Sequence, residues 1–199
     1  CNPSSGNLHP TEGYIVAQNC NGIADGVYHY LSRDHLLEQR CYLPQHSERL
    51  LPAESFLLGL SSIHWREAWK YGERAYRYCQ HDAGHAIAAV RYAAATLGWH
   101  ACVLTEWSDT AIASILGLER EADFAAAERE HPDAILLVQP SSPSRGRMTI
   151  DSDALCNAAR SAKWSGYANV LSRQHAHHWP IIETVAQACA KPATQTEAW

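Results

Sequence analysis

Residues 74–97 read RAYRYCQHDAGHAIAAVRYAAATL, and this stretch does most to decide the fold. Apolar side chains recur along it at the spacing of a single helical face, namely Ala83, Ala86, Ile87, Val90, Ala94 and Leu97. The many alanines leave room for other elements to pack closely, and Gly98 is a suitable C-terminal stop. The sequence therefore predicts a long central helix over residues 74–97.

Shorter apolar segments on both sides of this helix predict a mixture of strands and helices. Strands are predicted at 13–18, 26–31, 100–105 and 134–138, the first two as a hairpin, whereas 34–43 suits either a helix or a strand. Further helices are predicted at 63–71, 108–117, 151–163 and 180–190. Segments 44–48 and 140–147 have the composition of loops.

Capping residues support two of these helices. Ser61 and Ser62 are candidate N-caps for the helix that starts near Ile63. Ser108 and Gly117 bracket the helix predicted at 108–117, since serine favours the N-cap and glycine the C-terminal stop. We therefore expect both helices to begin and end close to these positions.

Composition restricts the class of protein. The chain has 199 residues, 46% of them hydrophobic, which is enough for one domain with a substantial core. Its formal net charge of -5 gives no basic surface for nucleic acid. No apolar run is long enough to span a bilayer, and the first residues do not resemble a signal peptide. The seven cysteines lack CxxC spacing, so we expect reduced thiols and a cytoplasmic protein.

Residues 3–12 read PSSGNLHPTE and form the first candidate binding segment. Two prolines bracket small and polar residues, so backbone amides are accessible and few side chains block an approaching ligand. Such a loop could hold the edge of a flat heterocycle. An ordinary surface turn is the alternative, because the same residue types dominate turns.

Residues 69–78, WKYGERAYRY, form the second candidate segment. Lys70 or Tyr71 could act as an acid or base near a reacting carbon, if burial adjusts its proton affinity. Arg74 and Arg77 could clamp an anionic group. The alternative is an amphipathic helix whose basic side chains extend to solvent.

Histidines supply two weaker candidates for a metal site. His81 and His85 lie four residues apart, which places both on one face of a helix, as in zinc sites. A metalloprotease motif requires Glu after the first His, where this chain has Asp82, and no third ligand is indicated. His175, His177 and His178 are interpreted as part of a solvated loop. We expect no metal site.

Taken together, four segments resemble a known family. PSSGNLHPTEGY, GVYHY followed by His35, WKYGERAYRY, and HDAGHAIAAVRYAAATLGW are similar, in order and spacing, to the SagB-type (thiazole/oxazole-forming oxidase-like) branch of the nitroreductase superfamily. The resemblance runs from about residue 3 to residue 117. It implies an α+β fold with a central, mostly antiparallel sheet flanked by helices. It also implies FMN at the interface between two such units, in a homodimer or a tandem pseudo-dimer.

The resemblance also implies roles for individual residues. The loop that it places along the isoalloxazine ring consists of Pro3, Ser4, Ser5, Gly6 and Asn7. It places Lys70 and Tyr71 on the substrate side of the flavin. Arg145 or Arg147 is the nearest match to the basic residue that binds the FMN phosphate.

The sequence departs from the family pattern at two places. The arginine-rich motif that normally precedes the PSSG loop is absent, so we expect a piece of a longer polypeptide, with a flavin domain over 1–190 that lacks its N-terminal part and a linker starting at 191–199. Thr105, Glu106 and Trp107 stand where the family often has a Gly-Gly pair. Trp107 is expected to crowd a ring face, and Glu106 to disfavour a reduced flavin.

Two functions are consistent with these observations. The first is an FMN-dependent oxidoreductase, in which the flavin accepts hydride from a substrate carbon or from NAD(P)H. In the SagB-type branch the reaction is dehydrogenation of an azoline ring in a modified peptide, and a small-molecule substrate is also open. The alternative is a degenerate, non-catalytic half that completes a pseudo-dimer interface.

Overall fold

The computed structural model describes residues 2–43, 49–140, 150–171 and 177–195. Seven strands form one sheet in the order β5-β6-β4-β1-β2-β3-β7, and every pairing is antiparallel. The strands are β1 (Thr11–Ala17), β2 (Gly26–Leu31), β3 (Leu36–Tyr42), β4 (Phe56–Ser62), β5 (His100–Val103), β6 (His131–Gln139) and β7 (Lys163–Trp164). The sequence-based expectation of an α+β fold with an antiparallel sheet is confirmed.

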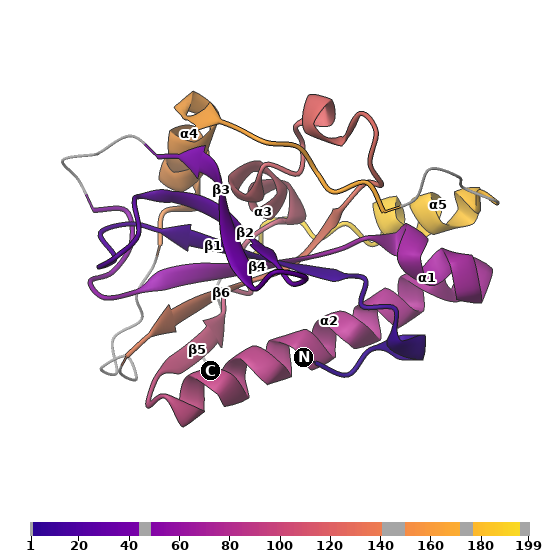
Figure 1. Ribbon diagram of the computed structural model, residues 1–199, viewed down its shortest axis with the longest axis horizontal. Coiled ribbons are helices and arrows are strands. Elements are labelled where there is room, and N and C mark those ends of the chain that lie inside the picture. Colours follow the sequence, from indigo (N-terminus) through magenta and orange to yellow (C-terminus); the bar gives the residue numbers. More distant parts are fainter. Residues whose placement is uncertain (1, 44–48, 141–149, 172–176, 196–199) are drawn as a thin grey trace.

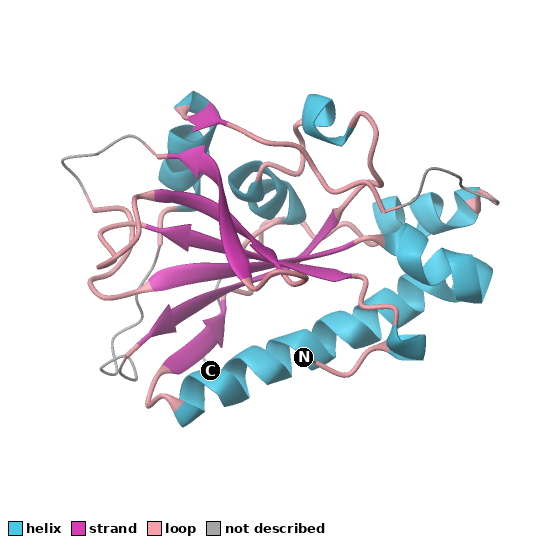
Figure 2. Cartoon of the chain, in the orientation of Figure 1, coloured by secondary structure: helices cyan, strands magenta, loops and turns pink. Residues whose placement is uncertain are grey.

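Helices cover both faces of this sheet. The helices are α1 (His64–Tyr71), α2 (Ala75–Thr96), α3 (Asp109–Leu116), α4 (Ser152–Ser161) and α5 (Pro180–Ala188), with short 3-10 turns η1 (Ser5–Asn7), η2 (Gly72–Arg74) and η3 (Glu121–Phe124). The long α2 runs along one face, while α3 and α4 lie on the other, and α1 and α5 lie together at one end (Figure 1). Figure 2 shows the same two layers of helix around the sheet.

The core is divided by the sheet into two parts. The larger part lies on the side of α3 and α4 and includes Leu57, Ile115, Ile135 and Leu155. The smaller part lies under α2 and is built from alanines of the helix against apolar side chains of β4, β5 and β6. Small side chains on α2 allow the helix to approach the sheet closely, as the sequence predicts.

The predicted central helix is confirmed, with a difference at its end. Of the predicted apolar face, Ala83, Ala86 and Ala94 are buried, and Ile87 and Val90 are partly buried. Leu97, expected on that face, is 68% exposed and caps the helix instead.

Two predictions concern segments next to the central strands: the ambiguous residues 34–43, and the N-caps at Ser61 and Ser62. Residues 36–42 form strand β3, which resolves the ambiguity in favour of a strand. Ser61 and Ser62 are not caps, because both belong to β4, which the sequence reading did not identify. The N-cap of α1 is Ile63, whose N–H donates to the carbonyl of Pro10 at 2.8 Å.

The capping prediction for α3 is confirmed. The Ser108 hydroxyl oxygen accepts the N–H of Ala111 at 3.1 Å, and Gly117 takes a left-handed conformation directly after the helix. Trp107, expected near a ring face, is instead 2% exposed and packed in the larger core. That part of the expected departure from the family pattern is therefore wrong.

The end of the described chain packs against α3. Lys191 accepts the N–H of Asp109 at 3.0 Å and donates its own N–H to the Asp109 carboxylate at 2.8 Å. Its ammonium donates to the carbonyl of Trp107 at 2.8 Å. No helix within the described ranges is long and apolar enough to cross a membrane.

Candidate functional site

Residues 3–10 form a loop that is held against the side of α2 by hydrogen bonds. The Ser4 hydroxyl donates to Asp82 Oδ2 at 2.6 Å, and Ser5 donates to Asp82 through both its N–H at 2.9 Å and its hydroxyl at 3.0 Å. Asp82 has no exposed surface. A buried carboxylate that accepts several hydrogen bonds fixes its donors firmly, so Asp82 positions the loop.

The two candidate segments of the sequence meet at Gly6. This glycine has φ +59, and a Cβ placed on it would lie 2.6 Å from Tyr71 Oη and 2.8 Å from Lys70 Nζ. Both separations are shorter than real Cβ contacts, so a larger residue here would displace the ends of the Lys70 and Tyr71 side chains. The loop, Lys70 and Tyr71 therefore share one small region.

Lys70 and Tyr71 are the last two residues of α1, directly before the chain turns at Gly72. Tyr71 ends α1, and Gly72 follows with φ +56, which favours glycine. The Tyr71 ring packs on Tyr78 of α2 with centroids 4.2 Å apart, and Lys70 Nζ lies 5.6 Å from the Tyr71 ring centroid. The aromatic contact fixes Tyr71, while Lys70 remains exposed.

The exposed surface of the loop carries Pro3, Gly6 and Asn7. Asn7 has φ 60, and its side-chain oxygen lies 2.9 Å from His9 Nε2. Asparagine tolerates this left-handed conformation better than most residues. Asn7 is exposed and follows Gly6 directly in the loop.

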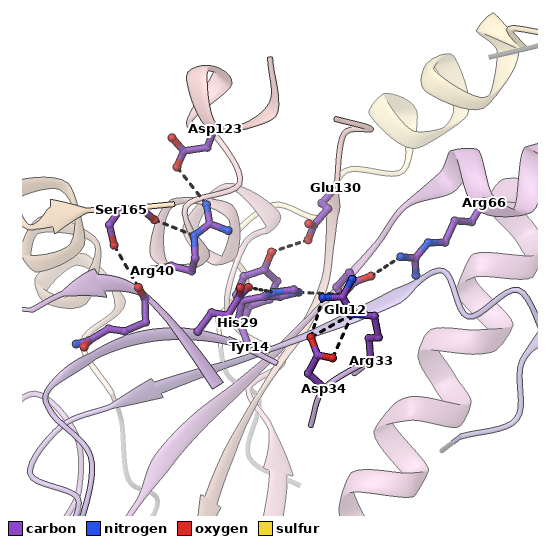
Figure 3. Close-up of polar contacts among 12 residues, drawn as sticks. Glu12, Tyr14, His29, Arg33, Asp34, Arg40, Arg66, Asp123, Glu130 and Ser165 are labelled. Carbon is purple, nitrogen blue, oxygen red and sulfur yellow. Dashed lines mark hydrogen bonds and ion pairs between the residues drawn. The ribbon is translucent and has the colours of Figure 1, made fainter. Parts of the chain in front are cut away.

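Charged side chains connect the end of the loop to the sheet (Figure 3). Arg66 of α1 donates to the carbonyl of His9 and forms an ion pair with Glu12 at 2.9 Å. Glu12 also contacts Nε2 of His29 at 2.9 Å, and Glu38 lies 3.3 Å from Nδ1 of the same ring. Burial lowers the pKa of His29, but the hydrogen bond and charge of Glu12 outweigh it, so the net pKa is raised.

Beside this chain of contacts lies the buried carboxyl group of Glu130. It accepts hydrogen bonds from Tyr14 Oη at 2.8 Å and from the Ser61 hydroxyl at 2.6 Å. Burial raises the pKa of Glu130. The hydroxyl of Ser61 therefore serves a buried polar network, which explains a serine at a fully buried strand position.

Glu67 is the site residue that the sequence reading missed. It has no exposed surface, and neither carboxyl oxygen has a hydrogen-bond partner among the described residues. Burial, together with the charge of Asp82, raises the pKa of Glu67 to about 7, while Lys70 lowers it. The only signal in the sequence is its position three residues before Lys70, on the same side of a helix.

Other predicted residues lie away from this region or outside the described chain. Arg145 and Arg147 lie outside the described residues. Arg74 and Arg77 are exposed, and Arg77 Nε donates to the ring of His81 at 3.4 Å. No group of three or more His, Cys, Asp or Glu within the described ranges is arranged to hold a metal ion.

Comparisons with known proteins identify relatives of this chain. It is 33% identical over 130 residues to the trifolitoxin-processing protein TfxB of Rhizobium leguminosarum bv. trifolii, which covers 59% of this chain and 35% of the relative. The chain thus spans about a third of that protein.

Two solved structures share the fold. A "putative nitroreductase" of Anabaena variabilis has a TM-score of 0.63 at 19% identity and covers 98% of this chain and 38% of its own. The E. coli microcin synthetase McbBCD complex with truncated pro-MccB17 bound has a TM-score of 0.55 at 21% identity, over 71% of this chain and 55% of that chain.

The family comparison covers the region that contains the loop, Lys70 and Tyr71. The sequence profile of the Nitroreductase family matches residues 2–127, more than half of the chain. The matched range includes the loop, α1, α2 and most of the sheet, so it coincides with the fold and the site described above. The chain belongs to the nitroreductase family.

Proposed function

We propose that this chain is the flavin-binding body of an FMN-dependent dehydrogenase of the SagB type. The observation that carries the proposal is the meeting of the loop, Lys70 and Tyr71 at Gly6. Membership of the nitroreductase family supports redox chemistry on a flavin. The finer assignment, to FMN and to the SagB-type branch, rests on the four sequence segments that resemble that branch.

The described residues fit the ring portion of FMN. A flat heterocycle needs an accessible backbone edge and a few hydrogen-bond donors, and the loop offers both beside the Lys70 ammonium and the Tyr71 hydroxyl. The glycine at Gly6 keeps the loop free of a side chain where it meets these donors. For the phosphate, the candidates remain Arg145 and Arg147, outside the described residues.

Each protein group has a defined part in the proposed reaction. When bound, FMN supplies the hydride acceptor. Only the neutral amine form of Lys70 can act as a base: it would accept the proton from the heteroatom or carbon next to the site of hydride loss, while Tyr71 orients the substrate by a hydrogen bond. Tyr78 holds the Tyr71 ring, and Asp82 holds the loop, so the donors are in place before the substrate binds.

A modified peptide is the proposed substrate class. The relative at 33% identity is named for processing of trifolitoxin, and the microcin synthetase complex was solved with truncated pro-MccB17 bound. We propose that this chain works with a second nitroreductase-like unit, in a homodimer or a tandem pseudo-dimer. The alternative of a non-catalytic half is weakened, because Trp107 is buried in the core and does not crowd a ring.

Two glycine variants test the proposed flavin site. Gly6 and Gly22 both have positive φ, but a Cβ on Gly22 would meet nothing within 4 Å. Both alanine variants therefore strain the backbone, whereas only Gly6→Ala pushes into Lys70 and Tyr71. We expect Gly6→Ala to weaken FMN binding to the full-length protein by about tenfold or more, and Gly22→Ala to leave it unchanged.

The measurement is an FMN titration followed by fluorescence quenching, with the flavin absorbance spectrum as a check. A full-length protein that binds no flavin would overturn the proposal. Equal affinities of the Gly6→Ala, Gly22→Ala and wild-type proteins would keep the flavin but remove the loop from its site.

A further inference from the structure

A pocket of about 320 Å³ lies between α1, α2, α5 and the start of β6. Its lining consists largely of ionisable and aromatic side chains, among them His64, Tyr76, Asp109, His131, Asp133, Glu183 and Lys191. We call it the carboxylate pocket, after its three acidic residues Asp109, Asp133 and Glu183. None of the residues assigned above to flavin or substrate lines it.

The carboxylate pocket lies on the opposite side of α2 from the loop. Tyr76 and Gln80 line the pocket, whereas Tyr78 and Asp82 contact Tyr71 and the loop. Successive residues of a helix are about 100° apart, so each of these pairs points about 200° away from the other. The pocket is therefore a separate site and does not depend on the proposed function.

The three carboxyl groups of the pocket outnumber its cations. Lys191 also lines the pocket and its charge lowers the pKa of Asp109, but burial has the larger effect and the net pKa is raised. No Lys or Arg side chain forms an ion pair with Asp109, Asp133 or Glu183 within the described ranges. His131 lies 3.5 Å from Glu183, which also accepts the Gln187 amide at 3.1 Å. The ammonium of Lys191 is directed to the carbonyls of Trp107 and Pro192 instead. The pocket thus has an excess of negative charge.

Asp133 has no cationic partner among the described residues. Its carboxyl accepts the Ser62 hydroxyl at 2.6 Å and the Gln80 amide at 3.5 Å, so it is oriented but not neutralised. Burial, with a further contribution from the charge of Asp109, raises the pKa of Asp133 to about 7. A cation placed between the two carboxylates would remove this penalty.

His64 provides a second, independent feature of the pocket. It is 5% exposed, and neither ring nitrogen has a hydrogen-bond partner within the described chain. Its ring stacks on His131 at 4.1 Å and meets Tyr76 edge-on at 5.4 Å. Burial lowers the pKa of His64 to about 3, so the ring is neutral and offers an unused acceptor together with an aromatic wall.

We propose that the carboxylate pocket binds an organic cation, a guanidinium or primary ammonium group on an alkyl stem. The charged group lies between Asp109 and Asp133, and the stem lies against the rings of His64, His131 and Tyr76. Charge-assisted hydrogen bonds hold such groups on carboxylates, and aromatic faces attract them. The ligand is a free small cation or the side chain of an arginine or lysine in a peptide.

The first experiment uses butylguanidinium, butylammonium and the neutral 1-butanol as probes of the full-length protein. Calorimetry should detect binding of both cations and none of 1-butanol. Binding near pH 7 should release protons from Asp133, so the measured heat should depend on the buffer's own heat of ionisation. A small cation that binds without this dependence, or 1-butanol that binds as well as the cations, would overturn the proposal.

Variants locate the binding site. Asp133→Asn and Asp109→Asn should each weaken binding of both cations by about tenfold or more, whereas Glu121→Gln, an exposed acid elsewhere, should not. Two aspartate variants are used so that one can replace the other if folding is lost. Affinity unchanged in the folded aspartate variants would place the cation elsewhere and refute the site.

A third comparison separates the two sources of the cation. A short peptide with one arginine is compared with the same peptide with norleucine and with butylguanidinium. An arginine peptide that binds about tenfold tighter than butylguanidinium assigns the pocket to a peptide side chain, and equal affinities assign it to a free cation. Binding of the norleucine peptide as tightly as the arginine peptide would contradict a cation site.

Discussion

At the residue scale, Lys70 is the side chain whose role is easiest to isolate. It is exposed, so removing it disturbs little packing, yet its ammonium lies beside Gly6 of the loop. General acid–base assistance contributes about 10²–10⁴-fold to a rate, and we expect Lys70→Ala to lower kcat per bound flavin by that order, with little change in Tm. Turnover and thermal unfolding are measured on one preparation of the full-length protein with FMN saturating.

Lys163→Ala is the matched control, because Lys163 is also an exposed lysine and lies on strand β7, outside the candidate site. Tyr71→Phe tests the neighbouring hydroxyl in the same assay. If both Lys70→Ala and Tyr71→Phe retain kcat within about threefold of wild type, well short of the general acid–base range, neither residue takes part in proton transfer.

Glu67 makes stability depend on pH. The folded-state pKa of Glu67, about 7, lies above the ordinary value of 4.5. The stability that its protonated form contributes is therefore fully present below pH 4.5 and is lost as pH rises through about 7. Replacing it with neutral glutamine removes this loss. We expect Glu67→Gln to be more stable than wild type by about 1–3 kcal/mol at about pH 8, with this advantage largely absent at about pH 4.

Urea unfolding of Glu67→Gln and wild type at both pH values gives this difference directly. Each protein is its own control, because any packing change from the substitution is the same at the two pH values. A difference in unfolding free energy that does not change with pH would show that the Glu67 carboxyl is not the group that titrates.

Part of the site was predictable from the sequence, and the rest required the fold. The loop and Lys70 were identified because their segments, taken with two others, resemble the SagB-type branch in order and spacing, whereas composition alone left a surface turn and an amphipathic helix open. The anchoring role of Asp82 and the burial of Glu67 were not, because burial depends on how α1 and α2 pack together. A carboxylate in an amphipathic sequence has the same pattern whether it faces water or the core.

At the scale of elements, the helices and several strands were predicted from local signals, but the buried strand β4 was not. The helix α2 and the caps of α3 carry strong local signals, which the structure confirms. The strand β4 lies between β1 and β6 and is mostly buried, so its sequence FLLGLSS lacks the alternation of a half-exposed strand. Its serines are satisfied by distant carboxyl groups, which no local pattern reveals.

Gly84 provides a test of α2 as an element. It lies in the interior of the helix on an exposed position, and a Cβ there would meet nothing within 4 Å. Alanine restricts the unfolded chain more than glycine does, so Gly84→Ala should stabilise the protein by about 0.5–1 kcal/mol in urea unfolding. Gly59→Ala is the contrasting variant, because its Cβ would lie 2.6 Å from Leu116 and should destabilise. Destabilisation by Gly84→Ala would mean that another surface covers this face.

At the scale of the whole molecule, α2 has a large surface that no described element covers. Tyr92 is 77% exposed and Leu97 68% exposed, and both lie at the C-terminal end of the helix. Obligate interfaces bury about 2,000 Å² or more, often around such apolar side chains. We therefore predict that this 199-residue chain alone is oligomeric or poorly soluble.

Variants of two equally exposed tyrosines distinguish loss of a specific interface from a general change in solubility. Tyr92 and Tyr167 are each 77% exposed, but Tyr167 lies in the segment after β7. In sedimentation at micromolar concentration, Tyr92→Glu should dissociate the oligomer, and Tyr167→Glu should not. A wild-type chain that sediments as a compact monomer would refute the predicted interface.

Because Asp82 binds the loop through hydrogen bonds, the backbone amide of Ser5 reports on the position of the loop. The Ser5 N–H donates to a carboxylate with no exposed surface, so its hydrogen can exchange with solvent only when the loop leaves α2. The exchange rate of that single amide measures how often the loop detaches, in the chain with or without any ligand. Slower exchange on addition of a ligand would therefore report that the ligand holds the loop against the helix, even for a compound that has no colour and undergoes no reaction.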